Sequence, residues 1–146
     1  MAVGPYQLPR LRVFNGDKYR NGQTQMVIPF ERNMIKLAVS EDIVRGNYRI
    51  GLIEDDVFKV KYVGRSVDQN LQTRILQHKN TADDHYYNDS YFFFYSSANT
   101  DEEAIRQECI DFHSFGEDEI LDNKEHPALP VGDACPFHGC DHVGGE

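Results

Sequence analysis

Residues 46–66, GNYRIGLIEDDVFKVKYVGRS, decide the fold. Apolar and polar residues alternate along VFKVKYV at 57–63, and this period of two is typical of a half-buried strand. Residues 48–53 have the composition of a second strand, and the acidic residues 54–56 between them favour a turn. The stretch therefore predicts a β-hairpin with strands at 48–53 and 57–63.

The chain after the hairpin alternates between helix and strand patterns. Residues 68–70 introduce a helix in which Leu71, Ile75 and Leu76 share one face, while Arg74 and His78 lie four positions apart on another. The aromatic run at 91–95 predicts a third strand. Asn99 or Thr100 caps a further helix, whose first turn holds three acidic residues. The order strand, strand, helix, strand, helix predicts an α+β fold built on a small antiparallel three-stranded sheet.

The flanking regions have weaker patterns. Prolines, glycines and mixed polar residues up to about Gly22 favour a loop or arm, and Pro29 interrupts the apolar residues that follow. We expect residues 1–45 to form an N-terminal extension packed on the core, with at most a short strand or helix. The expected domain covers residues 46–127, and residues 128–146 form a tail.

The composition bounds the class of protein. A chain of 146 residues with 40% hydrophobic residues fits one domain with a core. No signal-like or membrane-spanning stretch is visible, so an intracellular protein, cytoplasmic or nucleoid-associated, is expected. The net charge is −9, but by segment it is +3 for residues 1–45, +2 for 46–80 and −14 for 81–146. The first half of the chain could therefore face a phosphate backbone.

These motifs, in this order, resemble the GIY-YIG nuclease family over residues 46–127. Gly46-Asn47-Tyr48 resembles the first half of the family motif, and Tyr62-Val63-Gly64 resembles the second half. The remaining matches are Arg74 and His78 on the first helix, Glu108 on the second, and Asn123 in the segment DNKEHP at 122–127. The resemblance implies the GIY-YIG core and an active site made of Tyr48, Tyr62, Arg74, His78, Glu108 and Asn123.

Each residue type suits phosphodiester hydrolysis. A carboxylate at Glu108 gives Mg²⁺ or Mn²⁺ a hard oxygen ligand, and Arg74 offers two donors to a phosphate. Tyr48 and Tyr62 could place phenol oxygens beside the attacking water. The general base could be Tyr48, which needs a nearby cation, or His78, which titrates near neutrality, and the sequence leaves this choice open.

The end of the chain, CPFHGCDH at 135–142, concentrates Cys135, His138, Cys140 and His142. Thiolate and imidazole are the ligands that zinc prefers, although structural sites usually combine two ligand pairs from separated segments. The sequence leaves open whether these four residues form a zinc site or a plain tail.

The resemblance predicts an endonuclease acting on DNA, with RNA as the other nucleic acid left open. His85, Tyr86 and Tyr87 could stack on bases or simply pack. One active site makes one cut, so a homodimer or a partner protein could supply the second cut or the specificity. Two other classes compete: a catalytically idle module of the same fold that binds nucleic acid or protein, and a zinc-dependent interaction domain.

Overall fold

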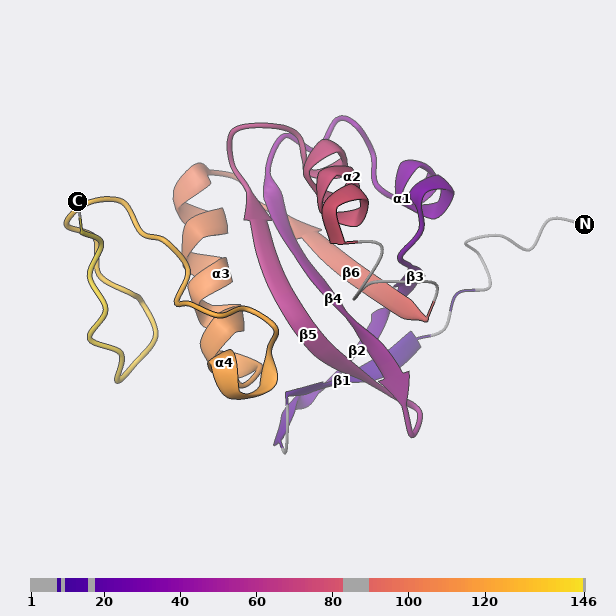
Figure 1. Cartoon of the computed structure of the whole chain (residues 1–146), viewed down its shortest axis with the longest axis horizontal. Helices are drawn as coiled ribbons and strands as arrows, with labels where there is room; N and C mark the ends of the chain where they lie inside the picture. Colours follow the sequence, from indigo (N-terminus) through magenta and orange to yellow (C-terminus); the bar gives the residue numbers. More distant parts are fainter. Residues whose placement is uncertain (1–7, 9, 16–17, 83–89, 146) are drawn as a thin grey trace, which may run out of the picture.

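The computed structural model describes residues 8, 10–15, 18–82 and 90–145 (Figure 1). In these residues it contains the strands β1 (Arg10–Asn15), β2 (Lys18–Met26), β3 (Ile28–Pro29), β4 (Gly46–Glu54), β5 (Val57–Ser66) and β6 (Tyr91–Ser97). The helices are α1 (Arg32–Ala38), α2 (Leu71–Ala82), α3 (Asp101–Ser114) and α4 (Glu117–Ile120). The fold is α+β, as expected, and no described helix has the length and apolar character to cross a membrane.

The predicted hairpin lies at the centre of the sheet. β4 pairs antiparallel with β5 on one side and with β6 on the other. Asp55 and Asp56 connect β4 to β5 with φ angles of 53° and 64°, the left-handed pair that a two-residue hairpin turn requires. α2 and α3 also fall where the sequence predicts them, and the Thr100 side chain caps α3 by accepting from the Glu103 amide at 3.1 Å.

The sheet is larger than expected, with six strands in the order β2-β1-β5-β4-β6-β3. Three of these strands come from residues 1–45, where the sequence indicated mostly loop. β1 pairs antiparallel with β2 and parallel with β5, and β3 pairs with the far edge strand β6. The expectation of a loop or arm up to about Gly22 was therefore wrong for residues 10–15 and 18–22, which lie in strands. A parallel pair between segments so far apart leaves no local turn signal in the sequence.

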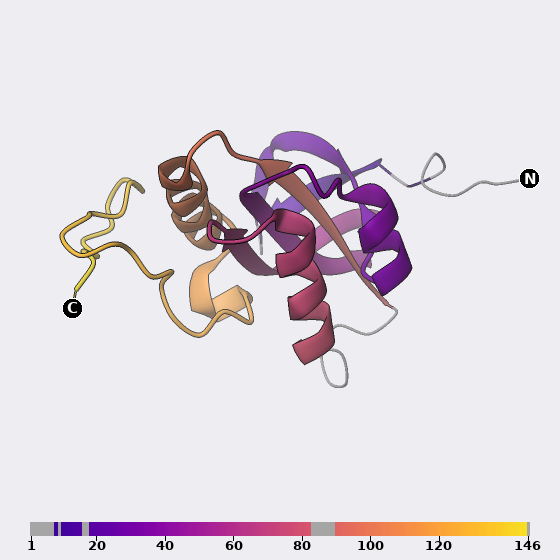
Figure 2. The same cartoon turned by 90° about the horizontal axis from the view of Figure 1, so that it is seen from above.

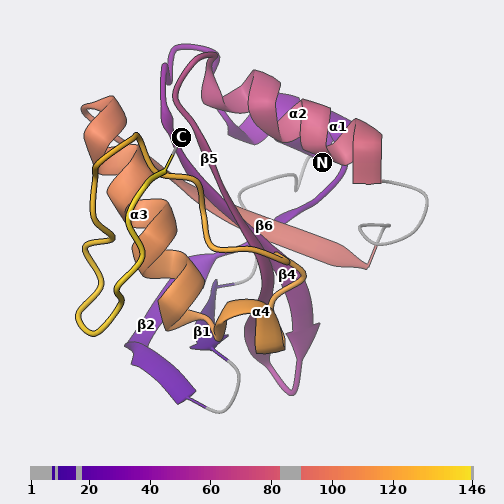
Figure 3. The same cartoon turned by 60° about the vertical axis from the view of Figure 1, so that its left-hand side comes forward.

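Helices cover both faces of the sheet (Figures 2 and 3). α1 and α2 close a core around Tyr48, Ile50, Ile75 and Phe93 on one face. α3 and α4 lie over the other, where Phe58, Val60, Val63, Phe94, Phe112 and Phe115 form a second core. Because side chains alternate along a strand, β4, β5 and β6 contribute to both cores.

Two residues of β4 on the α3 face fix that helix. Asn47 is buried and donates through Nδ2 to the Ala104 carbonyl at 2.9 Å. Arg49 forms an ion pair with Asp111, with 2.7 Å between Nε and Oδ2, and both side chains are at most 7% exposed. A pair buried this deeply requires both partners, since losing one leaves an uncompensated charge. These contacts set the position of α3 on the sheet.

One edge of β5 is left open by its neighbour. β1 pairs with β5 from Val57 to Lys59, and among the described residues no strand pairs with the second half of β5 on that side. The chain after α4 fills part of the gap, where the Asp122 amide donates to the Lys61 carbonyl at 2.6 Å. We call residues 122–145 the C-terminal segment. It runs beside α3 (Figures 1 and 3) and has one isolated β-bridge, between Ala134 and Val143, as its described pairing.

Candidate active site

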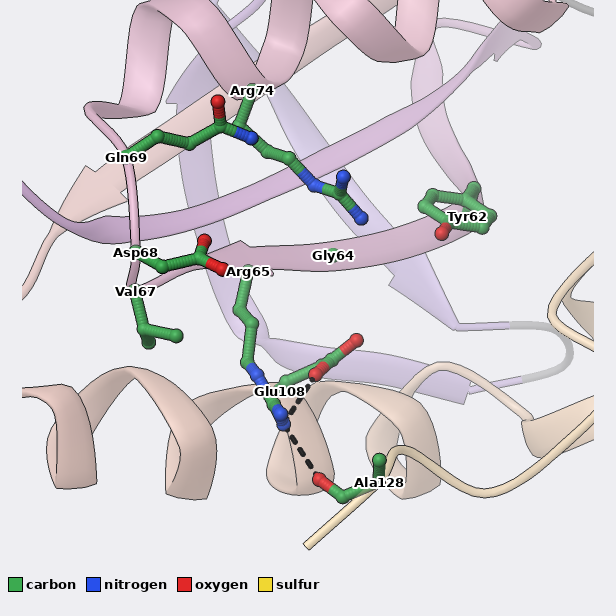
Figure 4. A pocket seen from close by; sticks show the side chains of 9 residues that line it. All are labelled: Tyr62, Gly64, Arg65, Val67, Asp68, Gln69, Arg74, Glu108 and Ala128. Carbon is green, nitrogen blue, oxygen red and sulfur yellow. Dashed lines mark hydrogen bonds and ion pairs between the residues drawn. The ribbon is translucent and has the colours of Figure 1, made fainter.

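A pocket of about 310 Å³ opens at this open edge of β5, between α2 on one face of the sheet and α3 on the other (Figure 4). Tyr62, Arg74 and Glu108, three of the six residues expected from the sequence, line it. The other residues lining it are Gly64, Arg65, Val67, Asp68, Gln69 and Ala128. The open edge is what allows side chains from opposite faces of the sheet to face one cavity.

Tyr48 and His78 lie behind the pocket rather than in its wall. Tyr48 is fully buried, and its phenol oxygen lies 3.4 Å from His78 Nδ1, a long hydrogen bond. The His78 ring contacts Tyr62, with 4.3 Å between ring centroids. The structure therefore brings the two tyrosines and the histidine into one aromatic group, of which Tyr62 is the member exposed to the pocket.

Gly64 leaves room for the Tyr48 phenol directly behind the pocket wall. The two residues are paired across β4 and β5, and a Cβ at Gly64 would lie 2.6 Å from the Tyr48 oxygen and closer still to its ring. The phenol therefore lies directly across the glycine backbone, which itself lines the pocket. Any side chain at position 64 would have to displace Tyr48.

Asn123 acts on the backbone of β5. Its Oδ1 accepts from the Val63 amide and its Nδ2 donates to the Val63 carbonyl, both at 3.0 Å. The Asn123 side chain therefore supplies the two hydrogen bonds that a neighbouring strand would make to Val63, between Tyr62 and Gly64. The sequence suggested a catalytic role for Asn123, whereas the structure gives its amide a positioning role at the edge of the strand.

Replacing Asn123 with Ala is expected to lower the free energy of unfolding by about 1–3 kcal/mol, because the amide and carbonyl of Val63 lose their partners. Urea denaturation followed by circular dichroism measures this. The adjacent exposed Lys124→Ala serves as the control and should change stability by less than about 0.5 kcal/mol. Equal effects from the two substitutions would mean that the two bonds to Val63 do not hold the edge of β5.

Arg65 is a pocket residue to which the sequence analysis gave no role. Its Nη1 donates to Glu108 Oε1 at 3.0 Å and to the Ala128 carbonyl at 2.7 Å. The signal was present in the period-two pattern, since Arg65 lies two positions after Val63 and so points to the α3 face. Its distant partners, Glu108 and Ala128, could not be read from that pattern.

Burial dominates the electrostatics of the site. It raises the pKa of Glu108 to about 7, although Arg65 and Arg74 act in the opposite direction. It also raises the pKa of both Tyr48 and Tyr62, and the positive charge of Arg74 offsets this only in part. Both phenols therefore stay protonated at neutral pH.

The imidazole of His78 has the opposite shift. Burial, and then the charge of Arg74, lowers its pKa to about 4. His78 is therefore neutral at physiological pH, and a neutral ring can accept a proton from the Tyr48 hydroxyl at Nδ1. Of the two general bases that the sequence left open, a standing phenolate at Tyr48 is disfavoured by its raised pKa, and the lowered pKa of His78 makes its ring a weaker base than free imidazole.

A second group of polar side chains lies on the outer side of α3. Among the described residues, one ligand atom each of His113, His126, Cys135 and Cys140 lie within 4.8 Å of one another and could hold a metal such as zinc. The sequence proposed His138 and His142 in place of the two histidines found here. His138 is exposed, while His142 stacks on His126 with ring centroids 4.0 Å apart. His85, Tyr86 and Tyr87 lie outside the described residues.

Comparison with known proteins finds no family model that matches the chain, and no curated protein or solved structure with a significant match. The residues of the pocket are therefore the basis for assigning a function.

Proposed function

We propose that the protein is a metal-dependent phosphodiester hydrolase of the GIY-YIG type that cleaves DNA. The observation that carries the proposal is the shared pocket of Tyr62, Arg74 and Glu108, with Tyr48 and His78 packed behind Tyr62. These residues come from β4, β5, α2 and α3, which fold in the order that the resemblance implies. If each of these residues were only an independent surface residue, there would be no reason for them to gather around one pocket.

The pocket suits a divalent cation bound at Glu108. The Glu108 side chain is 13% exposed, and burial without a cation makes its ionisation costly, as its raised pKa indicates. Oε1 is held by Arg65, and the carboxylate faces the pocket (Figure 4). The space of about 310 Å³ has room for several waters at about 30 Å³ each, and Mg²⁺ and Mn²⁺ keep such waters. When bound, the ion would neutralise charge on the phosphate and the leaving oxygen.

The chain's own residues perform the other tasks. Arg74 extends from α2 over β5 towards the pocket, where its guanidinium can hold two phosphate oxygens (Figure 4). Tyr62 presents its phenol to the same space and can orient the attacking water. The general base that takes the proton of the water is one of the two groups packed behind Tyr62, Tyr48 or His78. One pocket per chain makes one cut, so cleavage of both strands requires a second copy of the chain or a second binding event.

The proposal is tested with end-labelled duplex DNA and RNA of the same sequence. Protein incubated without divalent ions should leave the DNA intact, and addition of Mg²⁺ or Mn²⁺ should start cleavage with a defined 5′ or 3′ phosphate at each new end. If the protein cleaved RNA and not DNA, the proposed substrate would be wrong and the proposed reaction, phosphodiester hydrolysis, would stand. Binding of DNA without cleavage under any of these metals would identify an idle binding module instead.

The rate of cleavage at subsaturating Mg²⁺ should rise about tenfold per pH unit up to about pH 7 and level off above it. The reason is that Glu108, with its raised pKa, keeps its proton up to that pH, and the proton competes with the cation. Single-turnover rates between about pH 5.5 and 9 measure this, and more Mg²⁺ should move the midpoint to lower pH. A rate that still rises tenfold per unit at pH 9 would instead assign the limiting proton to a phenol.

A further inference from the structure

Four side chains from α3 and the C-terminal segment converge. His113 lies in the last turn of α3, and His126, Cys135 and Cys140 lie in the C-terminal segment. Their ligand atoms lie within 4.8 Å of one another. Cys135 is buried and the other three are half-buried, so the group is shielded from solvent.

The spacing fits a tetrahedral zinc centre. Zn–S bonds of about 2.3 Å and Zn–N bonds of about 2.0–2.1 Å place a sulfur and a nitrogen of the same centre about 3.5 Å apart. The distance from Cys140 Sγ to His126 Nε2 is 3.6 Å. The distance between these two atoms therefore already matches that of a zinc centre. The longest distance between two of the four ligand atoms, up to 4.8 Å, would have to shorten by about an ångström when zinc binds.

Both histidines are held in the tautomer that binds a metal. His113 Nδ1 lies 2.7 Å from the Glu117 carboxylate, and His126 Nδ1 lies 2.9 Å from the Pro127 carbonyl. Because a carbonyl only accepts, and a carboxylate accepts unless it carries a proton, each Nδ1 carries the hydrogen, and in the neutral ring that binds a metal each Nε2 then keeps its lone pair. Such outer contacts are those that orient histidine ligands in metal sites.

The free lone pair of His113 is the sharpest indication of a missing ligand. His113 Nε2 is buried and has no hydrogen-bond partner among the residues that the structure describes. A buried nitrogen without a partner costs about 1–3 kcal/mol, so native structures rarely keep one. An ion in the centre of the group would satisfy this nitrogen.

We infer that His113, His126, Cys135 and Cys140 form a structural zinc site that fastens the C-terminal segment to α3. Two thiolates and two imidazoles suit zinc, and four protein ligands leave no open position for a substrate. The two hydrophobic cores include no residue after Leu121 among those described, so apolar packing alone does not hold the segment. The zinc site supplies the attachment that the cores do not.

The zinc site also bears on the pocket. The C-terminal segment carries Ala128, whose carbonyl accepts from Arg65, and Arg65 in turn pairs with Glu108. Loss of the ion should therefore loosen one wall of the pocket. An effect of zinc loss on DNA cleavage rests on the proposed nuclease function, whereas the presence of the zinc ion does not. A protein that contains zinc but does not cleave DNA would support the zinc site and refute the nuclease function. A protein that cleaves DNA but contains no zinc would refute the zinc site and support the nuclease function.

The test is metal analysis of the full chain purified with reductant and without chelator. Wild type should contain about one zinc per chain, and Cys140→Ser should retain less than about a tenth of that amount. His138→Ala is the matched control. It removes an exposed histidine from between the two cysteines, and this variant should bind zinc as the wild type does.

A second measurement does not depend on how well a variant folds. Wild-type protein loaded with Co²⁺ should show the intense visible bands of a tetrahedral ion with two thiolate ligands, and zinc should displace them. Metal removal should also make the C-terminal segment the first site of limited proteolysis. A wild-type protein that takes up neither ion, an equal loss of zinc in His138→Ala, or a Cys135–Cys140 disulfide in its place would overturn the inference.

Discussion

Glu108→Gln is expected to lower the rate of Mg²⁺-dependent cleavage by about a thousandfold or more, because it removes a charged group that acts in the transition state. Glutamine keeps the shape and can still accept from Arg65, but it lacks the charge that binds the cation. Since the carboxylate is already costly to ionise, the melting temperature should change by less than about 5 °C. Single-turnover cleavage and thermal unfolding measure the two effects.

Glu102→Gln is the matched control for that experiment. Glu102 is an exposed acid on the same helix and does not line the pocket, so its substitution removes one charge without touching the site. It should leave the cleavage rate within about twofold of wild type. If the Glu108 variant cut as fast as this control, Glu108 would have no part in the reaction.

Arg74→Ala is expected to lower turnover by about a hundredfold or more while the affinity for DNA changes little, because its fork of donors acts on charge that grows in the transition state. Arg74→Lys should recover only part of the rate, since lysine restores the charge without two fixed donors. Loss of the charge should also raise the pKa of Tyr48 and His78, because Arg74 lowers both.

The experiment separates chemistry from binding. Single-turnover rates are measured at saturating enzyme, and affinity is measured in Ca²⁺, which should support binding without cleavage. Arg106→Ala, on the exposed part of α3, controls for the loss of one positive charge. A variant that binds DNA weakly but keeps its single-turnover rate would make Arg74 a docking residue, and the proposed site would need to be redrawn.

Local patterns in the sequence predicted the elements that carry the site. The β4–β5 hairpin follows from alternation and from two aspartates that tolerate the left-handed turn. Arg74 and His78 share one face of α2 because they are four residues apart. Thr100 caps α3 as its position suggested. Each of these features depends on neighbours within a few positions.

Contacts between distant segments could not be predicted in the same way. β1 joins β5, and β3 joins β6, from distant parts of the chain, so neither pairing has a connecting turn that marks it in the sequence. The resemblance indicated Asn123 as an active-site residue, and its two bonds to Val63 could not be predicted from the sequence. The group of ligand side chains combines His113 from a helix with His126 from the chain that follows α4, whereas the sequence indicated His138 and His142, the histidines nearest to the two cysteines along the chain.

The most direct test of the account is nicking of supercoiled plasmid by the wild-type protein, compared with Glu108→Gln purified in parallel. Without divalent ions both preparations should leave the plasmid supercoiled. After addition of Mg²⁺ the wild type should produce the nicked circle, while the variant should not, which excludes a contaminating nuclease. Equal nicking by both preparations, or none by wild type with either Mg²⁺ or Mn²⁺, would contradict the assignment of this pocket as a phosphodiesterase site.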